Sequence, residues 1–149
     1  MSRSTLLPLL ANGEFHSGQE LADALGVSRT AVWKQVNRLA ADSGIAVETV
    51  KGRGYRIPGG LDLLDADRIS AALQARPRSL LSRLDILDSV DSTNAEVLRR
   101  AEQGGACGLV CTAEQQTAGR GRRGRQWVSP YASNLYVSLL WEFSQGAAA

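Results

Sequence analysis

The chain has 149 residues, 44% of them hydrophobic and 21% charged, and a formal net charge of +2. These ordinary globular values exclude wholesale disorder, and no apolar run reaches the roughly 20 residues of a membrane span. Because the amino-terminal segment also lacks the pattern of a signal peptide and two cysteines are too few for a disulfide scaffold, we expect a soluble, cytoplasmic protein with no membrane contact.

The amino-terminal segment begins with two predicted helices. Leucines at positions 6, 7, 9 and 10 predict the first helix, which ends near Gly13. Ser17 and Glu20 have the spacing of a capping box, in which each side chain bonds the other residue's backbone. Gly26 fits the residue that follows a helix, so a second short helix is predicted between these signals.

A longer helix and a hairpin follow. Ser28 can cap the helix, and Val32, Val36 and Leu39 recur at the spacing of one buried face. Strand-like segments then flank the turn at residues 51–54, which predicts a β-hairpin. Two helices joined by a tight turn and followed by a hairpin are typical of a winged helix-turn-helix.

The exposed face of the third helix and the tip of the hairpin carry side chains suited to DNA. Arginine and lysine contact phosphates or guanine edges, asparagine reads adenine, and threonine can meet a thymine methyl group. The candidate DNA-binding residues are Arg29, Thr30, Trp33, Lys34, Asn37, Arg38, Lys51 and Arg53. The alternative is a winged helix that contacts proteins and whose charges are merely solvated. Cations on both the helix and the hairpin favour DNA.

A Pro-Gly-Gly sequence marks a linker. We therefore expect a DNA-binding domain in residues 1–57, a linker in residues 58–60 and a second domain in residues 61–149. The elements predicted in the second domain are a helix over residues 61–73 and strands over residues 84–90, 109–113 and 135–143. Thr93 and Glu96 have the spacing of a second capping box. Mixed helices and strands indicate an α/β or α+β domain.

Arginine and glycine alternate in residues 119–125, which we call the Arg/Gly loop. Its four arginines repel one another, and its glycines let the backbone approach a ligand closely. An anionic ligand with several phosphate oxygens would suit both features. The alternative is a solvated basic loop or a nonspecific nucleic-acid patch. Cys107 and Cys111 have no histidine nearby, so no metal site is predicted.

Several motifs in this order resemble the bifunctional biotin protein ligases, the biotin operon repressors. They are residues 17–57, Asp91–Asn94, Gln116–Trp127, Ser129-Pro130 and Asn134-Leu135-Tyr136. The Arg/Gly loop with a tryptophan two residues later is the most specific of them. The resemblance implies an α+β chain, in which a class II synthetase-like α/β catalytic domain follows the winged helix.

The resemblance also implies a two-step reaction. The carboxylate of biotin attacks ATP, which carries Mg²⁺, to give biotinoyl-5′-AMP and pyrophosphate. A lysine of the biotin carboxyl carrier protein then attacks this mixed anhydride. Arg120 and Arg122 would act as catalytic residues by stabilising charge on the transferring phosphorus. The implied biotin and adenylate ligands are Ser92, Thr93, Asn94, Gln116, Arg120, Gly121, Arg122 and Trp127. The family's regulation adds an adenylate-dependent homodimer that binds a palindromic operator and represses transcription.

Two features of the family are absent from this sequence. Its Lys-Trp-Pro-Asn-Asp motif, whose lysine contributes to adenylation, is missing, and no lysine follows Lys51. Its small carboxy-terminal β-barrel domain is missing too. We therefore expect a truncated fragment without ligase activity, whose last strand lacks partners. One alternative is a DNA-binding regulator with a degenerate, ligand-sensing ligase domain, and another is a nucleic-acid binder that uses the Arg/Gly loop.

Overall fold

The chain divides into two compact units. The computed structural model describes residues 6–121, 123, 125 and 127–143. Unit 1 comprises Met1–Leu63 and Pro130–Ala132, and unit 2 comprises Leu64–Ser129 and Ser133–Ala149. The first division thus falls after Leu63, just beyond the Pro-Gly-Gly sequence.

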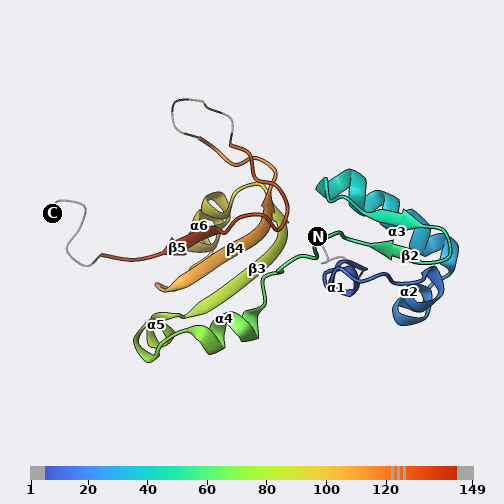
Figure 1. Cartoon of the computed structure of the whole chain (residues 1–149). Coiled ribbons are helices and arrows are strands. Elements are labelled where there is room, and N and C mark those ends of the chain that lie inside the picture. Colours follow the sequence, from blue (N-terminus) through green and yellow to red (C-terminus); the bar gives the residue numbers. More distant parts are fainter. Residues whose placement is uncertain (1–5, 122, 124, 126, 144–149) are drawn as a thin grey trace. The chain divides into compact units, whose positions relative to one another are not determined.

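Three helices form most of unit 1 (Figure 1). They are α1 (Leu6–Leu10), α2 (Gly18–Leu25) and α3 (Arg29–Ser43). The backbone N–H of Glu20 donates to Ser17 Oγ at 3.1 Å, and the N–H of Ser17 donates to the Glu20 carboxylate at 2.7 Å. The predicted capping box is therefore confirmed. Gly26 ends α2 in the left-handed conformation, as predicted.

The wing of unit 1 is the hairpin of β1 (Glu48–Val50) and β2 (Gly54–Arg56). His16 and Tyr55 add a further antiparallel bridge, in which each backbone N–H donates to the other residue's carbonyl at 2.9 Å. Gly54 has a φ of 104°, and a Cβ on it would lie 2.0 Å from the His16 carbonyl oxygen. The hairpin therefore packs against the segment before α2 so closely that only glycine fits there.

The core of unit 1 is apolar. Its buried residues are Leu6, Leu7, Leu10, Leu21, Ala22, Val32, Val36, Leu39, Ile45, Ile57 and Tyr131. The buried face predicted for α3 is confirmed. Tyr131 was not predicted, because nothing local links it to residues so far away in the chain.

Unit 2 is a three-stranded sheet with a helix packed on one face (Figure 1). Its elements are α4 (Ala66–Ala72), α5 (Ala75–Leu80), β3 (Arg83–Val90), α6 (Thr93–Glu102), β4 (Leu109–Gln116) and β5 (Tyr136–Leu140). The strand order is β3-β4-β5, with β3 and β4 parallel and β5 antiparallel to β4. On α6, Val97 packs against Leu109 and Cys111 of β4. A helix-turn-helix unit followed by a mixed unit confirms the predicted fold class.

The structure differs from the prediction at several boundaries. The helix expected over residues 61–73 is the shorter α4, and α5 was not predicted. Neither helix buries a residue, so their apolar side chains gave a misleading signal. β5 lies at the edge of the sheet, where Val137 and Leu139 are 51% and 53% exposed. Among the described residues, no helix is long and apolar enough to cross a membrane.

Candidate functional site

The carboxyl ends of β3 and β4 bring two of the predicted segments together. The parallel pairing of these strands continues past their ends, because Thr117 N–H donates to the Val90 carbonyl and Ala118 N–H donates to the Asp91 carbonyl, each at 2.8 Å. The start of α6 therefore lies beside the residues that lead into the Arg/Gly loop.

Gln116 is the centre of a hydrogen-bonded cluster at this edge. Its Oε1 accepts from the backbone N–H of Thr93 at 2.8 Å and from Thr93 Oγ1 at 3.1 Å. Its Nε2 donates to Ser129 Oγ at 3.4 Å, and Thr93 Oγ1 lies 3.0 Å from Ser138 Oγ. Thr93 and Ser129 are buried, so these bonds give their hydroxyl oxygens partners inside the protein.

The donors and acceptors of this cluster follow a fixed direction. A backbone N–H can only donate, so the amide oxygen of Gln116 must face Thr93. The single hydroxyl proton of Thr93 goes to Gln116, and Ser138 therefore donates to Thr93. Among the described residues, the second Nε2 proton of Gln116 and the hydroxyl proton of Ser129 have no acceptor. This side of the cluster can donate to a ligand's oxygen atoms.

Gly119, the first residue of the Arg/Gly loop, lies against the same cluster. A Cβ on Gly119 would come within 2.6 Å of Trp127 Cδ1 and within 3.3 Å of both Gln116 Nε2 and Ser129 Oγ. The indole of Trp127 thus approaches the Gly119 backbone while its side chain stays about half exposed. The absence of a side chain at Gly119 leaves the space that this approach needs.

Ion pairs surround the first turns of α6. The Arg99 guanidinium donates to both oxygens of Asp91 at 2.8 and 2.9 Å and to Glu96 Oε2 at 2.7 and 2.9 Å. Arg100 donates to the other oxygen of Glu96 at 2.7 Å. The hydrogen bonds from Arg99 hold the pKa values of the Asp91 and Glu96 carboxyls below their usual range. Both carboxylates are therefore ionised at neutral pH.

The capping box predicted at Thr93 and Glu96 is wrong. Ser92, one residue earlier, is the N-cap of α6, and its side chain makes no capping bond. The Thr93 hydroxyl bonds Gln116, and the Glu96 carboxylate bonds two arginines. A tertiary partner for Thr93 and two arginines on the same helix for Glu96 have replaced the bonds that the spacing predicted.

The structure unites some of the predicted ligand-binding residues and leaves others apart. Thr93, Gln116 and Trp127 lie together, with Ser92 at the start of α6. Asn94 is exposed, and within the described part of the chain no hydrogen bond links its side chain to the cluster. Arg120 is exposed in the loop, and Gly121 N–H donates to the Arg125 carbonyl at 3.2 Å.

Arg122 lies outside the described residues. The sequence did not single out Ser138 or Arg99. Ser138 joins the cluster only through the pairing of β5 with β4, and Arg99 lies two helical turns beyond the carboxylate that it binds. Neither relation leaves a local signal. The described residues contain no group of three or more histidine, cysteine, aspartate or glutamate side chains that could hold a metal ion.

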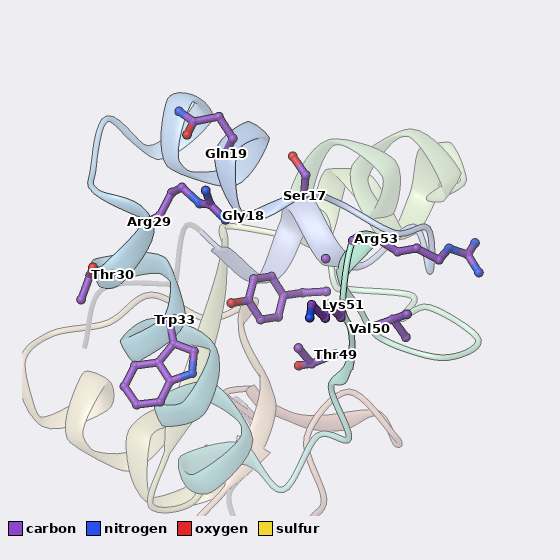
Figure 2. Close-up of a pocket in the computed structure, with 13 residues that line it drawn as sticks. Ser17, Gly18, Gln19, Arg29, Thr30, Trp33, Thr49, Val50, Lys51 and Arg53 are labelled. Carbon is purple, nitrogen blue, oxygen red and sulfur yellow. The ribbon is translucent and has the colours of Figure 1, made fainter.

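A second candidate site is a hollow of about 750 Å³ on unit 1, between α3 and the wing (Figure 2). Arg29, Thr30 and Trp33 line it from α3, and Lys51 and Arg53 line it from the wing. The remaining lining residues, which the sequence did not suggest as DNA-binding residues, are Ser17, Gly18, Gln19, Thr49, Val50, Gly52, Gly54 and Tyr55. Cationic and uncharged side chains alone form its walls, which suits a polyanion.

The other candidates on α3 do not line the hollow. Lys34, Asn37 and Arg38 are exposed, and Arg38 pairs with Asp42 at 3.2 Å. Trp33 is 56% exposed and so does not belong to the core.

Arg53 lines the hollow only at its edge, and its guanidinium points away from it (Figure 2). Its guanidinium lies 4.1 Å from the centroid of the Phe15 ring, and that of Arg56 lies 4.4 Å from it. Arg56 is also paired with Glu48 at 2.6 Å. Cation–π contact thus holds Arg53 at the outer edge of the wing.

Comparison with known proteins gives matches in both units. Residues 2–56 match an HTH domain, and residues 86–148 match the biotin/lipoate A/B protein ligase family. The chain is 47% identical over 145 residues to the bifunctional ligase/repressor BirA of Salmonella typhimurium. The aligned residues are 97% of this chain and 43% of that protein.

Two further relatives carry the same name. The chain is 45% identical over 144 residues to BirA of Escherichia coli K12, with 97% of this chain and 42% of that protein covered. The chain is 38% identical over 133 residues to BirA of Bacillus subtilis, and this alignment covers 87% of this chain and 39% of that protein. The chain spans less than half the length of these curated relatives.

Proposed function

We propose that this chain is part of a bifunctional biotin protein ligase and transcriptional repressor, because residues 2–56 match an HTH domain and residues 86–148 match the biotin/lipoate A/B protein ligase family. The cluster of Thr93, Gln116 and Ser129 beside Gly119 and Trp127 is the observation that carries the proposal. Its directed donors suit the oxygen atoms of a biotin ligand, and the arginines of the adjoining loop suit a phosphate.

In the proposed reaction, a carboxylate oxygen of biotin attacks the α-phosphorus of ATP and the bond to pyrophosphate breaks. A lysine amine of the biotin carboxyl carrier protein then attacks the acyl carbon, and AMP leaves. Arg120 and Arg122 offset the repulsion between the carboxylate and the triphosphate. In this proposal Mg²⁺ accompanies ATP, whose phosphate oxygens are ligands that the ion prefers.

Arg120→Ala is expected to weaken binding of biotinoyl-5′-AMP to this chain by about ten- to a hundredfold, because a hydrogen bond to a charged group contributes about 1.5–3 kcal/mol. Titration calorimetry measures the Kd. Arg76→Ala, which removes an exposed arginine from α5, serves as the control and should bind as the wild type does. An unchanged Kd for Arg120→Ala would contradict the proposed role of the loop. A wild-type chain that does not bind biotinoyl-5′-AMP would contradict the proposed identity of the ligand.

We assign operator DNA to the hollow between α3 and the wing. An adenylate-dependent homodimer would present two such hollows to a palindromic site. Since the operator and the carrier protein are both cytoplasmic partners, the proposed function belongs to that compartment.

Lys51→Ala combined with Arg53→Ala should weaken DNA binding and lower its salt dependence. Each phosphate contact contributes about 0.9 to the slope of log Kobs against log salt concentration, so the slope should fall by about 2. Fluorescence anisotropy with a duplex selected from a random library measures it. Arg76→Ala combined with Arg83→Ala removes the same charge from unit 2 and should leave the slope unchanged. An unaltered slope in the wing variant would mean that the wing does not contact DNA.

A further inference from the structure

Asp91 lies at the junction between the two walls of the proposed adenylate site. Its backbone carbonyl accepts from Ala118 N–H at 2.8 Å, which fixes the approach to the Arg/Gly loop. Its Oδ1 accepts from Ser92 N–H at 2.8 Å, which fixes the residue before α6. One residue therefore connects the segment that carries Thr93 with the segment that carries Gly119.

The Asp91 side chain would rotate freely if it were alone, because about half of its surface is exposed. Arg99 prevents this by holding both carboxylate oxygens in its planar fork, a geometry that fixes the plane of the carboxylate as well as its position. A single-point donor such as lysine would leave that plane free.

Arg99 is itself held in place by the helix. Glu96 accepts two of its N–H groups, and Arg100 holds the opposite oxygen of Glu96. The three side chains form a chain of ion pairs along α6 that ends at Asp91. An isolated exposed pair contributes little, whereas in a network each member is already ordered by another.

We propose that Arg99 is a positioning residue of the adenylate site: by fixing the Asp91 carboxylate it holds the start of α6 against the start of the Arg/Gly loop. This inference rests on the proposed function. Within the described part of the chain, the hydrogen bonds of Arg99 go to Asp91 and Glu96 and none goes to Gln116 or Trp127, so we expect its effect on a ligand to pass through Asp91. Loss of Arg99 frees the Asp91 side chain, weakens the bond to Ser92 N–H and loosens the Ala118 segment.

The test uses the full chain and three variants. Arg99→Gln keeps most of the length of the side chain and removes the charge, and Arg99→Lys keeps the charge and removes the fork. Arg83→Ala is the matched control, because it removes an exposed guanidinium that binds Asp85 at 2.6 Å at the far end of β3. Amide hydrogen exchange is measured without ligand, and calorimetry gives the Kd for biotinol-5′-AMP, an analogue without the labile anhydride.

For Arg99→Gln, exchange at Ser92 and Ala118 should accelerate about tenfold, while the amides of Leu109–Ala113 in β4 keep the wild-type rate. The Kd of Arg99→Gln for the analogue should be about tenfold higher than that of the wild type. The Kd of Arg99→Lys should lie between these two values, and Arg83→Ala should have the wild-type Kd. Wild-type exchange at both amides in Arg99→Gln would overturn the inference. Faster exchange across β4 as well would also overturn it, since Arg99 would then support the whole fold. If the wild-type chain does not bind the analogue, the proposed function fails, and exchange alone decides the role of Arg99.

Discussion

Replacing Gly54 with alanine is expected to separate the wing from the segment before α2 and to abolish DNA binding. The added Cβ would lie 2.0 Å from the His16 carbonyl oxygen and 2.7 Å from Ser17 Cα, and both are backbone atoms that cannot turn aside. Strain at positive φ costs about 1–3 kcal/mol, and each lost bond between His16 and Tyr55 costs about 1 kcal/mol. Urea unfolding of unit 1 should therefore show a loss of about 3 kcal/mol.

Gly52→Ala is the matched control for this prediction. Gly52 lies in the same hairpin with a φ of 82°, but a Cβ there would meet no atom within 4 Å. The control carries the backbone strain without the collision, so it should lose less of its free energy of unfolding than Gly54→Ala does. Equal losses in the two variants would show that strain alone, and not the close approach of the wing, makes Gly54 necessary.

Gly119→Ala is expected to weaken binding of biotinol-5′-AMP by about a hundredfold, which corresponds to about 2.7 kcal/mol. The new methyl group would displace the Trp127 indole and press on Gln116 and Ser129. Because Trp127 is half exposed, it can move without unfolding the sheet, and the free energy of unfolding should change by less than about 1 kcal/mol. Calorimetry and urea titration measure the two quantities.

Gly104→Ala is the control for Gly119→Ala. Gly104 follows α6 in the same unit at a φ of 82°, and a Cβ there would touch no other atom within 4 Å. This variant should bind the analogue with the wild-type Kd. A Gly119→Ala protein with unchanged affinity would show that the packing of Trp127 on Gly119 does not shape the ligand site.

Features with local causes were predictable from the sequence. The box at Ser17 and Glu20 formed because both partners lie within one helical turn and no stronger partner competes. The same spacing at Thr93 and Glu96 failed because Gln116, which is remote in sequence, binds the Thr93 hydroxyl, and Arg99 and Arg100 on the same helix bind the Glu96 carboxylate. Capping patterns thus predict well only where no other partner, remote or on the same helix, competes for the side chains.

The candidate ligand site was predictable in part, where its residues belong to motifs that can be read along the sequence. The motif resemblance identified Thr93, Gln116 and Trp127, which the structure places together. It did not identify Ser138, because the contact depends on how β5 pairs with β4. The short helices α4 and α5 escaped correct prediction because nothing buries them, so their apolar pattern carries little information about their ends.

The bond between Ser138 and Thr93 also protects β5 against misalignment. β5 is apolar on both faces, so hydrophobicity alone scarcely distinguishes its correct alignment from one displaced by a single residue. Such a displacement would turn every side chain to the opposite face and bring Val137 or Leu139 opposite the buried Thr93 hydroxyl. The hydroxyl of Ser138 makes that error costly, because Thr93 would lose its hydrogen-bond donor. One serine thereby keeps an edge strand in its proper alignment and preserves the contact between that strand and the Thr93 cluster.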